Sequence, residues 1–515
     1  MPCDYPVTRY GAVGDGVTLD TLAIQAAIDA AHAAGGGRVI FPATADSARG
    51  ANSGSAGGAG ASGAGAGGAG VFRSGSIFLK QGVELCLERG ATLLGSNRLD
   101  DYPKRPTRIE GHVEPWRMAL INAENLRGVR IGGEGTIDGN GLMFWAAFWQ
   151  RRRENPNCTN LEVERPRLLF IDRCHDVRIG GPADAAAANA TSTTSSAVSA
   201  SGPASEDSAS GASSESSESS ESSADSASNA PSEGEPHPLT ASSLGASPGM
   251  LTLRDSGFWT VHLYRCREVL VERAAIYSPS NVPVRAPSTD GIDVDSCQDV
   301  TVRGCAISVD DDCVAIKGSK GPLADRDPDS PPVENVLIEH CTFGDGHGVV
   351  TIGSEATRVR GVTVRHCRVT GRNAVVRLKL RPDTPQLYED LLFEHIELTR
   401  QTAGGAGAGS DGGGERGGAG GDLFDVQPWT QFFDLKGHPP PTRTVRNLTV
   451  RHVTGHFGGL GIVAGNPGDR LERITLQNVH VQVDRDRLKL GSVTDFEVSD
   501  VTVNGRPLRT AEVKG

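Results

Sequence analysis

One pattern of polar and apolar residues recurs along most of the chain. A polar residue precedes an apolar one, and alternation then leads into a second short apolar run, as in RCREVLVERAAI, SCQDVTVRGCAI and VENVLIEHCTF. We call the first apolar residue of each run the anchor. The anchors are Val269, Val300, Val336, Val362, Leu391, Leu448, Ile474 and Phe496. Most lie 22 to 36 residues apart, and short β-branched strands at this period predict stacked coils that bury their inner faces against one another.

Two other repetitive folds fit this pattern less well. A leucine-rich repeat keeps an L-x-x-L-x-L frame, and no such frame persists along this chain. The blades of a β-propeller are longer than these repeats. The pattern therefore predicts an all-β solenoid.

The N-terminal segment predicts a helix that caps this solenoid. Asp20 is suited to the N-cap, the helix runs to Ala34, and Gly35, Gly36 and Gly37 end it. Its apolar residues fall on one face, at Ile24, Ala27, Ile28 and Ala31. The strand RVIFP follows. A helix in this place would cover the open edge of the first coil, which a solenoid has to protect.

Three segments of low complexity interrupt the pattern. Residues 44–70 are almost entirely Ala, Gly and Ser, residues 183–248 are rich in Ala and Ser, and residues 403–421 are rich in Gly. Such compositions cannot bury a core. Because similar strand patterns resume on each side, we interpret the segments as inserts in one domain that spans residues 1–515.

Charge and composition bear on partners and location. The formal net charge of −12 argues against nucleic acid as the main partner. No apolar run has the length of a membrane-spanning helix, so we expect no membrane partner. The first residues lack the apolar segment of a signal peptide, so the sequence as given predicts a cytoplasmic protein. If the N-terminus is incomplete, we expect an extracellular protein. We expect a monomer.

The ten cysteines are expected to be core residues rather than metal ligands. None forms a C-x-x-C pair, which argues against a zinc ribbon. Several recur at matching places in the repeat, where a free cysteine packs as a small apolar residue. A few disulfides remain open as an alternative.

Carboxylates gather in two consecutive repeats. Asp290 follows Ser288 closely, and Asp311 and Asp312 lie 21 and 22 residues after Asp290, about one coil later. Stacked strands are roughly 4.8 Å apart, so these acids could share one face of the solenoid. Repulsion between neighbouring carboxylates raises at least one pKa, which yields an acid that protonates a leaving oxygen beside carboxylates that activate water. Glycoside hydrolysis needs this pair of roles.

The next two repeats add an imidazole and two cations. His347 stands between two glycines, 36 residues after Asp311, and Arg377 follows 30 residues after His347. Arg377 and Lys379 are two residues apart on an expected strand, so both point the same way and could bind a sugar carboxylate. His347 could approach a substrate closely and tune the neighbouring acid.

Each of these segments has a plainer interpretation when it is taken alone. The acids at 310–312 could form a solvated turn or a Ca²⁺ site, the Asp-Gly pair at 290–291 could be a turn, and the two cations could lie on a solvent-facing strand. Their order and coil spacing favour a shared site. Strict alternation would point Asp311 and Asp312 to opposite faces, so a shared site requires a bend or bulge there.

Nearly the whole chain outside the inserts resembles glycoside hydrolase family 28, the polygalacturonase family. The resemblance begins with YGAVGDGVTLDTLAIQAAIDAA and is strongest in STDGIDVDSC, DDDCVAIKG, GHGVVTIGSE and VRLKLRPD. It implies a single-stranded right-handed parallel β-helix and inverting hydrolysis of α-linked, uronate-containing pectic chains, with no cofactor and no metal. By motif position it implies that Asp311 is the general acid, that Asp290 and Asp312 hold and deprotonate the attacking water, and that His347 supports the acid.

The same resemblance assigns substrate binding to Arg377 and Lys379, and two positions depart from the family pattern. Ser288 stands where the family usually has Asn, and the family's substrate-binding Tyr has no clear counterpart. We expect Ser288 to lie near the substrate, and Trp429 in FDVQPWTQFFD to stack on a sugar ring. Homogalacturonan, rhamnogalacturonan and an exo-type oligosaccharide end all remain open as substrates.

Two other functions remain open for such a β-helix. A pectate-lyase-like enzyme would use Ca²⁺ at the aspartates, and its unsaturated product would absorb ultraviolet light. A non-catalytic sugar-binding β-helix would keep its function after Asp311→Asn, whereas a hydrolase would lose several orders of magnitude in rate.

Overall fold

The structure is a computed structural model that describes residues 3–43, 70–181, 247–279, 284–399 and 421–509. The three predicted inserts lie outside these ranges, except for residues 70, 247–248 and 421 at their ends. The prediction of one domain with three inserts therefore stays a prediction.

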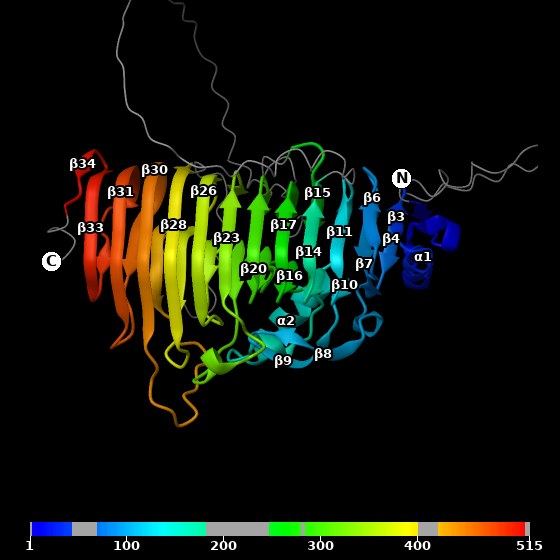
Figure 1. The fold of residues 1–515 in the computed structure, drawn as a ribbon, viewed down its shortest axis with the longest axis horizontal. Coiled ribbons are helices and arrows are strands. Elements are labelled where there is room, and N and C mark those ends of the chain that lie inside the picture. Colours follow the sequence, from blue (N-terminus) through cyan, green and yellow to red (C-terminus); the bar gives the residue numbers. More distant parts are fainter. Residues whose placement is uncertain (1–2, 44–69, 182–246, 280–283, 400–420, 510–515) are drawn as a thin grey trace, which may run out of the picture. The chain divides into compact units, whose positions relative to one another are not determined.

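The described strands stack in rows, and within a row each strand pairs in parallel with the corresponding strand of the next coil (Figure 1). The row that holds the anchors, which we call the anchor row, consists of β1 (Asp4–Pro6), β3 (Gly37–Phe41), β6 (Val83–Leu87), β11 (Arg127–Gly133), β14 (His175–Gly180), β17 (Arg267–Glu272), β20 (Gln298–Arg303), β23 (Val333–Glu339), β26 (Arg358–Val369), β28 (Gln386–Leu398), β30 (Arg443–Val463), β31 (Arg470–Arg485) and β33 (Val493–Val503).

A second row carries the candidate chemistry, and we call it the site row. It consists of β5 (Ile77–Phe78), β10 (Ile121–Glu124), β13 (Leu169–Asp172), β16 (Val261–Tyr264), β19 (Ile292–Asp295), β22 (Val314–Lys317), β25 (Gly348–Ile352), β27 (Ala374–Leu380) and β29 (Asp422–Pro428). A further row consists of β2 (Asp15–Leu19), β4 (Val71–Ser74), β7 (Thr92–Gly95), β12 (Thr136–Asp138), β15 (Leu251–Arg254), β18 (Ala274–Tyr277), β21 (Ala306–Ser308) and β24 (Thr342–Phe343). The short strands β32 (Lys489–Leu490) and β34 (Arg506–Pro507) lie near the C-terminus. The predicted solenoid is confirmed as a parallel β-helix.

The anchors form one continuous buried column. Val269 pairs with Val300, Val300 pairs with Val336, and the series continues in register to Phe496. No anchor is more than 2% exposed. The residues before the anchors have a left-handed backbone, with φ between 53° and 71°, and are Glu268, Asp299, Asn335, Gly361, Asp390, Asn447, Arg473 and Asp495. Asn, Asp and Gly tolerate this conformation best, so the polar residue of the repeat marks a kink in the backbone of each coil.

The cysteines are core residues, as the sequence predicts. All ten are free thiols, and all except Cys3 and Cys86 are buried. Burial raises the pKa of the Cys174 thiol to about 12, so it stays protonated and packs as a small apolar group. The alternative of disulfides is therefore not supported.

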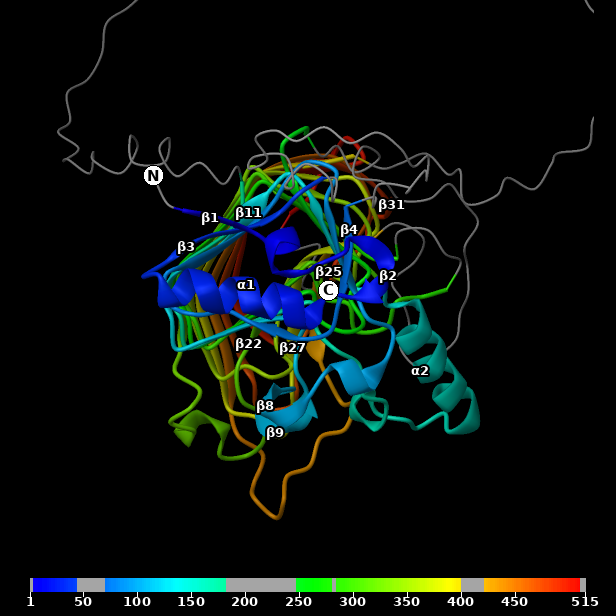
Figure 2. The ribbon, with the colours of Figure 1, turned by 90° about the vertical axis from the view of Figure 1, so that its right-hand side faces the viewer.

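The capping helix α1 (Thr21–Ala33) crosses the N-terminal end of the coils (Figure 2) and buries the predicted face of Ile24, Ala27, Ile28 and Ala31. The prediction for Asp20 is wrong in one respect. Asp20 precedes the helix, but its side chain makes no capping hydrogen bond. Its carboxylate accepts hydrogen bonds from the backbone N–H groups of Val13 (2.8 Å) and Gly14 (3.1 Å), which ties the preceding loop to the start of the helix.

Several elements lie outside the rows. They are the helix α2 (Leu142–Glu154), the antiparallel hairpin of β8 (Lys104–Ile109) and β9 (His112–Arg117), and short 3₁₀ turns at Val7–Tyr10, Leu99–Asp101, Asn160–Glu162 and Ala324–Arg326. The hairpin reaches the site row through Arg108, whose Nε lies 2.9 Å from Asp295 Oδ2. Among the described residues, we find no helix with the length and apolar character needed to cross a membrane.

Candidate active site

The register of the site row places two of the predicted acids side by side. Ile292 of β19 pairs with Val314 of β22, and Asp290 and Asp312 lie two residues before these partners. The Gly291 N–H donates a 2.9 Å hydrogen bond to the Asp312 carbonyl, so the two segments stay adjacent beyond the strands. Asp290 is 2% exposed and Asp312 is 1% exposed.

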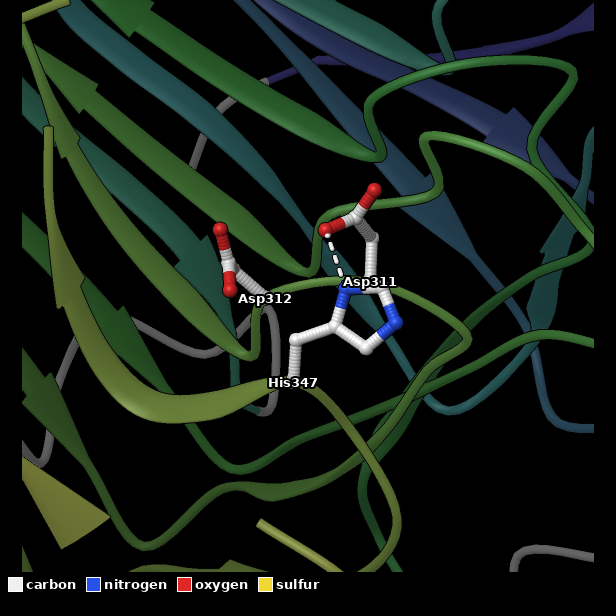
Figure 3. Close-up of side chains that lie close together, drawn as sticks. All are labelled: Asp311, Asp312 and His347. Carbon is white, nitrogen blue, oxygen red and sulfur yellow. Dashed lines mark hydrogen bonds and ion pairs between the residues drawn. The ribbon is translucent and has the colours of Figure 1, made fainter. Parts of the chain in front are cut away.

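The chain bends between β21 and β22, at Asp310 and Asp311. The bend brings the side chains of Asp311 and Asp312 into one region beside His347, which precedes β25 (Figure 3). His347 Nδ1 lies 2.9 Å from Asp311 Oδ1. One nitrogen or oxygen atom from each of Asp311, Asp312 and His347 lies within 4.8 Å of the others. The structure therefore contains the bend that a shared site requires.

These three side chains are close enough to share a cation, yet each already has a protein partner. Asp311 and His347 contact each other, and Asp312 contacts Lys379 and Arg377. The expectation of a site without metal or cofactor stays a prediction.

Donor groups surround Asp312. Lys379 Nζ lies 2.8 Å from Oδ2, Arg377 Nη1 lies 3.3 Å from Oδ1, and the Thr351 hydroxyl donates a 2.6 Å hydrogen bond to Oδ1. Burial by itself raises the pKa of Asp312, but Lys379 and Arg377 outweigh burial and hold this pKa below its usual value. Asp312 is therefore a carboxylate at neutral pH.

The buried charge of Asp290 is balanced by fewer cations than that of Asp312. Lys317 Nζ lies 3.0 Å from Asp290 Oδ2 and 3.4 Å from Asp293 Oδ1, so two buried carboxyl groups share one ammonium group. Burial raises the pKa of Asp290 to about 6; Lys317 opposes this shift, and the charges of Asp311 and Asp312 add to it. A carboxyl group with such a pKa is well suited to accept a proton near neutral pH.

The pKa of Asp311 is lowered, whereas its position beside other carboxylates in the sequence suggests a raised pKa. Burial acts to raise its pKa, but His347, Lys379 and Lys317 outweigh burial and lower the pKa of Asp311 below its usual value. The carboxyl group with the raised pKa is that of Asp290 instead. Asp311 is therefore ionised in the free protein, and His347 Nδ1 lies 2.9 Å from its Oδ1.

The two predicted substrate cations face carboxylates of the protein. Besides Asp312, Arg377 contacts Asp425 of β29, with Nε 3.0 Å from Oδ2. The side chains of Arg377 and Lys379 are 13% and 12% exposed, so they are not the solvent-facing pair of the plainer interpretation. Their binding of a substrate carboxylate stays a prediction.

Ser288 and Trp429 lie in different surroundings. Ser288 is buried with a φ of 57°, and Arg165 Nη2 lies 3.5 Å from its Oγ. Trp429 is half-buried, and its ring centre lies 4.8 Å from Lys379 Nζ and 5.7 Å from Arg377 Cζ. Trp429 thus borders the two cations, whereas Ser288 contacts Arg165. Contact of either residue with substrate stays a prediction.

Sequence reasoning missed Lys317, Asp293 and Thr351. Lys317 ends β22 and Asp293 lies on β19, and both strands are buried at every position. A charged residue inside a short apolar strand was the available signal, because a charge is almost never fully buried without a partner. Thr351 carries no charge and fits a strand in any case, so its sequence gives no such signal.

The fold is a β-helix, and carboxyl groups gathered on one of its faces are the kind of site that cleavage of a glycosidic bond requires. The sequence model of Glycosyl hydrolases family 28 matches residues 221–404, a range that includes Asp290, Asp311, Asp312, His347, Arg377 and Lys379. Over these residues the chain is similar to members of this family, and its relatives indicate that it is a glycoside hydrolase.

Relatives and a solved structure agree with this assignment. The chain is 24% identical to exo-poly-alpha-D-galacturonosidase of Dickeya chrysanthemi over 510 residues, which cover 96% of this chain and 69% of that enzyme. It is 26% identical to endo-polygalacturonase of Pectobacterium carotovorum subsp. carotovorum over 439 residues, or 84% of this chain and 81% of that enzyme. The hyperthermoactive exopolygalacturonase of Thermotoga maritima has a similar structure, with a TM-score of 0.53 at 17% identity over 98% of this chain and 93% of that one. The structural likeness identifies the fold as a right-handed parallel β-helix.

Proposed function

We propose that this glycoside hydrolase cleaves the α-linked uronate chains of pectin by an inverting reaction. The observation that carries the proposal is the group of cations around the acids, formed by Lys317, Arg377 and Lys379. The chain as a whole has a net charge of −12, so an anionic sugar needs cations at its binding site, and these three cations gather there although each also contacts a carboxyl group of the protein. The relatives described above carry the names of galacturonate-cleaving enzymes, which supports the same substrate class.

In this proposal Asp311 protonates the leaving glycosidic oxygen. The imidazole of His347 passes a proton to Asp311 across the 2.9 Å contact between them, and this transfer generates the neutral acid. Substrate carboxylates and the exclusion of water both disfavour a charged Asp311, so bound substrate favours the transfer. A positioned general acid contributes roughly 10² to 10⁴-fold in rate.

Asp290 and Asp312 divide the activation of water between them. Asp312 is held as a carboxylate by Lys379, Arg377 and Thr351, and it orients the water. Asp290 accepts the proton of the water, because its pKa of about 6 makes it the stronger base of the two. Attack from the face opposite the leaving oxygen inverts the anomeric centre.

Release of new reducing ends from defined substrates tests this proposal. We expect release from polygalacturonate or rhamnogalacturonan, and none from an uncharged arabinan that serves as the control. The size of the early products distinguishes attack at chain ends from attack within the chain. Failure to cleave either acidic polymer would contradict the proposal.

The same assay separates hydrolysis from elimination. A Ca²⁺-dependent lyase would stop in EDTA, and its product would absorb ultraviolet light. We expect cleavage to continue in EDTA without any rise in ultraviolet absorbance.

A further inference from the structure

The carboxyl group of Asp293 accepts no hydrogen bond from the described residues. It lies on β19 with 0% exposure, and neither of its oxygens receives a hydrogen bond from a donor group within the described ranges. Lys317 Nζ lies 3.4 Å from Asp293 Oδ1 but only 3.0 Å from Asp290 Oδ2. An ionised carboxylate in so buried a place, with one shared ammonium group, is costly.

A proton on Asp293 removes this cost. Lys317 Nζ contacts both carboxyl groups and so holds Asp290 and Asp293 near each other, and two carboxyl groups can form a hydrogen bond only when one of them is protonated. Burial raises the pKa of Asp293 well above its usual value, and the charge of Asp290 adds to the rise. With one proton on Asp293, the two acids and Lys317 are together neutral.

We propose that Asp293, as a neutral acid, donates a hydrogen bond to the Asp290 carboxylate, and that Lys317 completes the support of this carboxylate by an ion pair. Asp293 and Lys317 are then positioning residues, and only Asp290 touches the attacking water. The inference rests on the proposed function, in which Asp290 accepts the proton of that water.

The charges around this group come from several elements. His262 is the strand partner of Asp293, and Arg167 acts on Asp293 by its charge. Asp311 and Asp312 act on Asp290, and Glu355 acts on Lys317. The Trp259 ring centre lies 4.5 Å from Lys317 Nζ. The substitutions below leave these side chains in place, so a change in pH dependence reports on Asp293 or Lys317 itself.

The pH profile of kcat/KM on polygalacturonate tests the role of Lys317. Activity needs an ionised Asp290, so kcat/KM falls as the pH falls through the pKa of Asp290, about 6. Lys317→Met removes a positive charge that lowers this pKa, so the acid limb moves to higher pH, by about 1 to 2 units. A purely structural lysine would lower the rate at every pH and leave the limb in place. The matched control Lys80→Met, at an exposed pair with Asp29, keeps the wild-type profile.

Asp293→Asn tests where the proton lies. The amide donates the same hydrogen bond without a charge, so we expect an acid limb within about 0.3 pH units of wild type and a kcat within about threefold. An ionised Asp293 would give a different result, because its removal would take away a negative charge and move the limb down by about one unit or more. That downward shift, or an unmoved limb in Lys317→Met, would overturn the inference.

A titration without substrate separates this inference from the proposed function. The carboxyl ¹³C resonance of Asp290 is assigned by its loss in Asp290→Asn, and its titration gives the pKa of Asp290 in the wild type and in both variants. Relative to wild type, we expect a higher pKa in Lys317→Met and a nearly unchanged pKa in Asp293→Asn. A protein that cleaves no pectic polymer but shows these shifts would contradict the proposed function alone. Unchanged resonances in Lys317→Met would contradict the inference alone.

Discussion

The strands β20 and β22 are separated along the chain only by the short strand β21, but β20 buries one face and β22 buries both. In β20 of the anchor row, buried residues alternate with more exposed ones, whereas every residue of β22 in the site row is buried. The neighbouring strands β13, β16, β19 and β25 of the site row are also buried at every position. A coil needs only one buried face, so charged groups buried on a second face cost stability without serving the fold. The comparison teaches that the second face of the site row carries buried charges that the fold does not need, which favours this face as the place of the proposed reaction.

The hairpin of β8 and β9 provides part of the cover over this second face. Arg108 Nε lies 2.9 Å from Asp295 Oδ2, and its guanidinium lies 5.0 Å from the centre of the Tyr264 ring. Burial acts to raise the pKa of Asp295, but Arg108 and His262 outweigh it and lower this pKa. The anchor row has no need of such compensation, because its interior is apolar.

The largest expected effect comes from the chemistry of the site row. Asp311→Asn removes the proposed proton donor but keeps the shape of the side chain, so we expect kcat on polygalacturonate to fall by roughly 10² to 10⁴-fold. The midpoint of guanidinium unfolding should stay close to wild type. A variant with near-normal kcat would show that Asp311 does not donate the proton.

The converse change in the anchor row should affect stability instead. Val300→Ala removes buried methyl groups from the anchor column, where Val300 is 0% exposed, and should lower the free energy of unfolding by about 2 kcal/mol. Guanidinium unfolding measures this loss. We expect kcat/KM of the folded variant to match wild type. A loss of activity without a loss of stability would contradict the division between a stabilising anchor row and a catalytic site row.

A smaller effect is expected at the edge of the site, where Lys379 contacts Asp312 and borders Trp429. Lys379→Met removes a cation that we expect to bind a substrate carboxylate, so KM should rise roughly tenfold. Steady-state kinetics on oligogalacturonates measure this change. Lys489→Met, at an exposed position of β32, is the matched control and should leave KM unchanged.

The smallest effect is expected on the outer surface of the anchor row. Arg368 and Glu397 form an ion pair of 3.1 Å between β26 and β28, and both side chains are 57% exposed. Exposed pairs contribute little, so Arg368→Ala should change the free energy of unfolding by less than about 1 kcal/mol and leave kcat/KM intact. A larger loss of stability would mean that surface charges hold the coils together.

The sequence revealed more of the anchor row than of the site row. The anchors recur beside residues that tolerate a left-handed backbone, so both the coil and its kink leave a local pattern, as in Asn335–Val336. The placement of Asp293 and Lys317 leaves no such pattern, because their contact joins two coils. The pKa of Asp311 was not accessible either, since it depends on the 2.9 Å contact with His347, 36 residues further on.

The anomeric form of the first product tests the account most directly. Polygalacturonate incubated with the protein should give, in early proton NMR spectra, a new reducing end in the β form, because an α linkage is inverted when water attacks from the opposite face. A product that first appears in the α form, or one with a double bond in the terminal ring, would contradict the account.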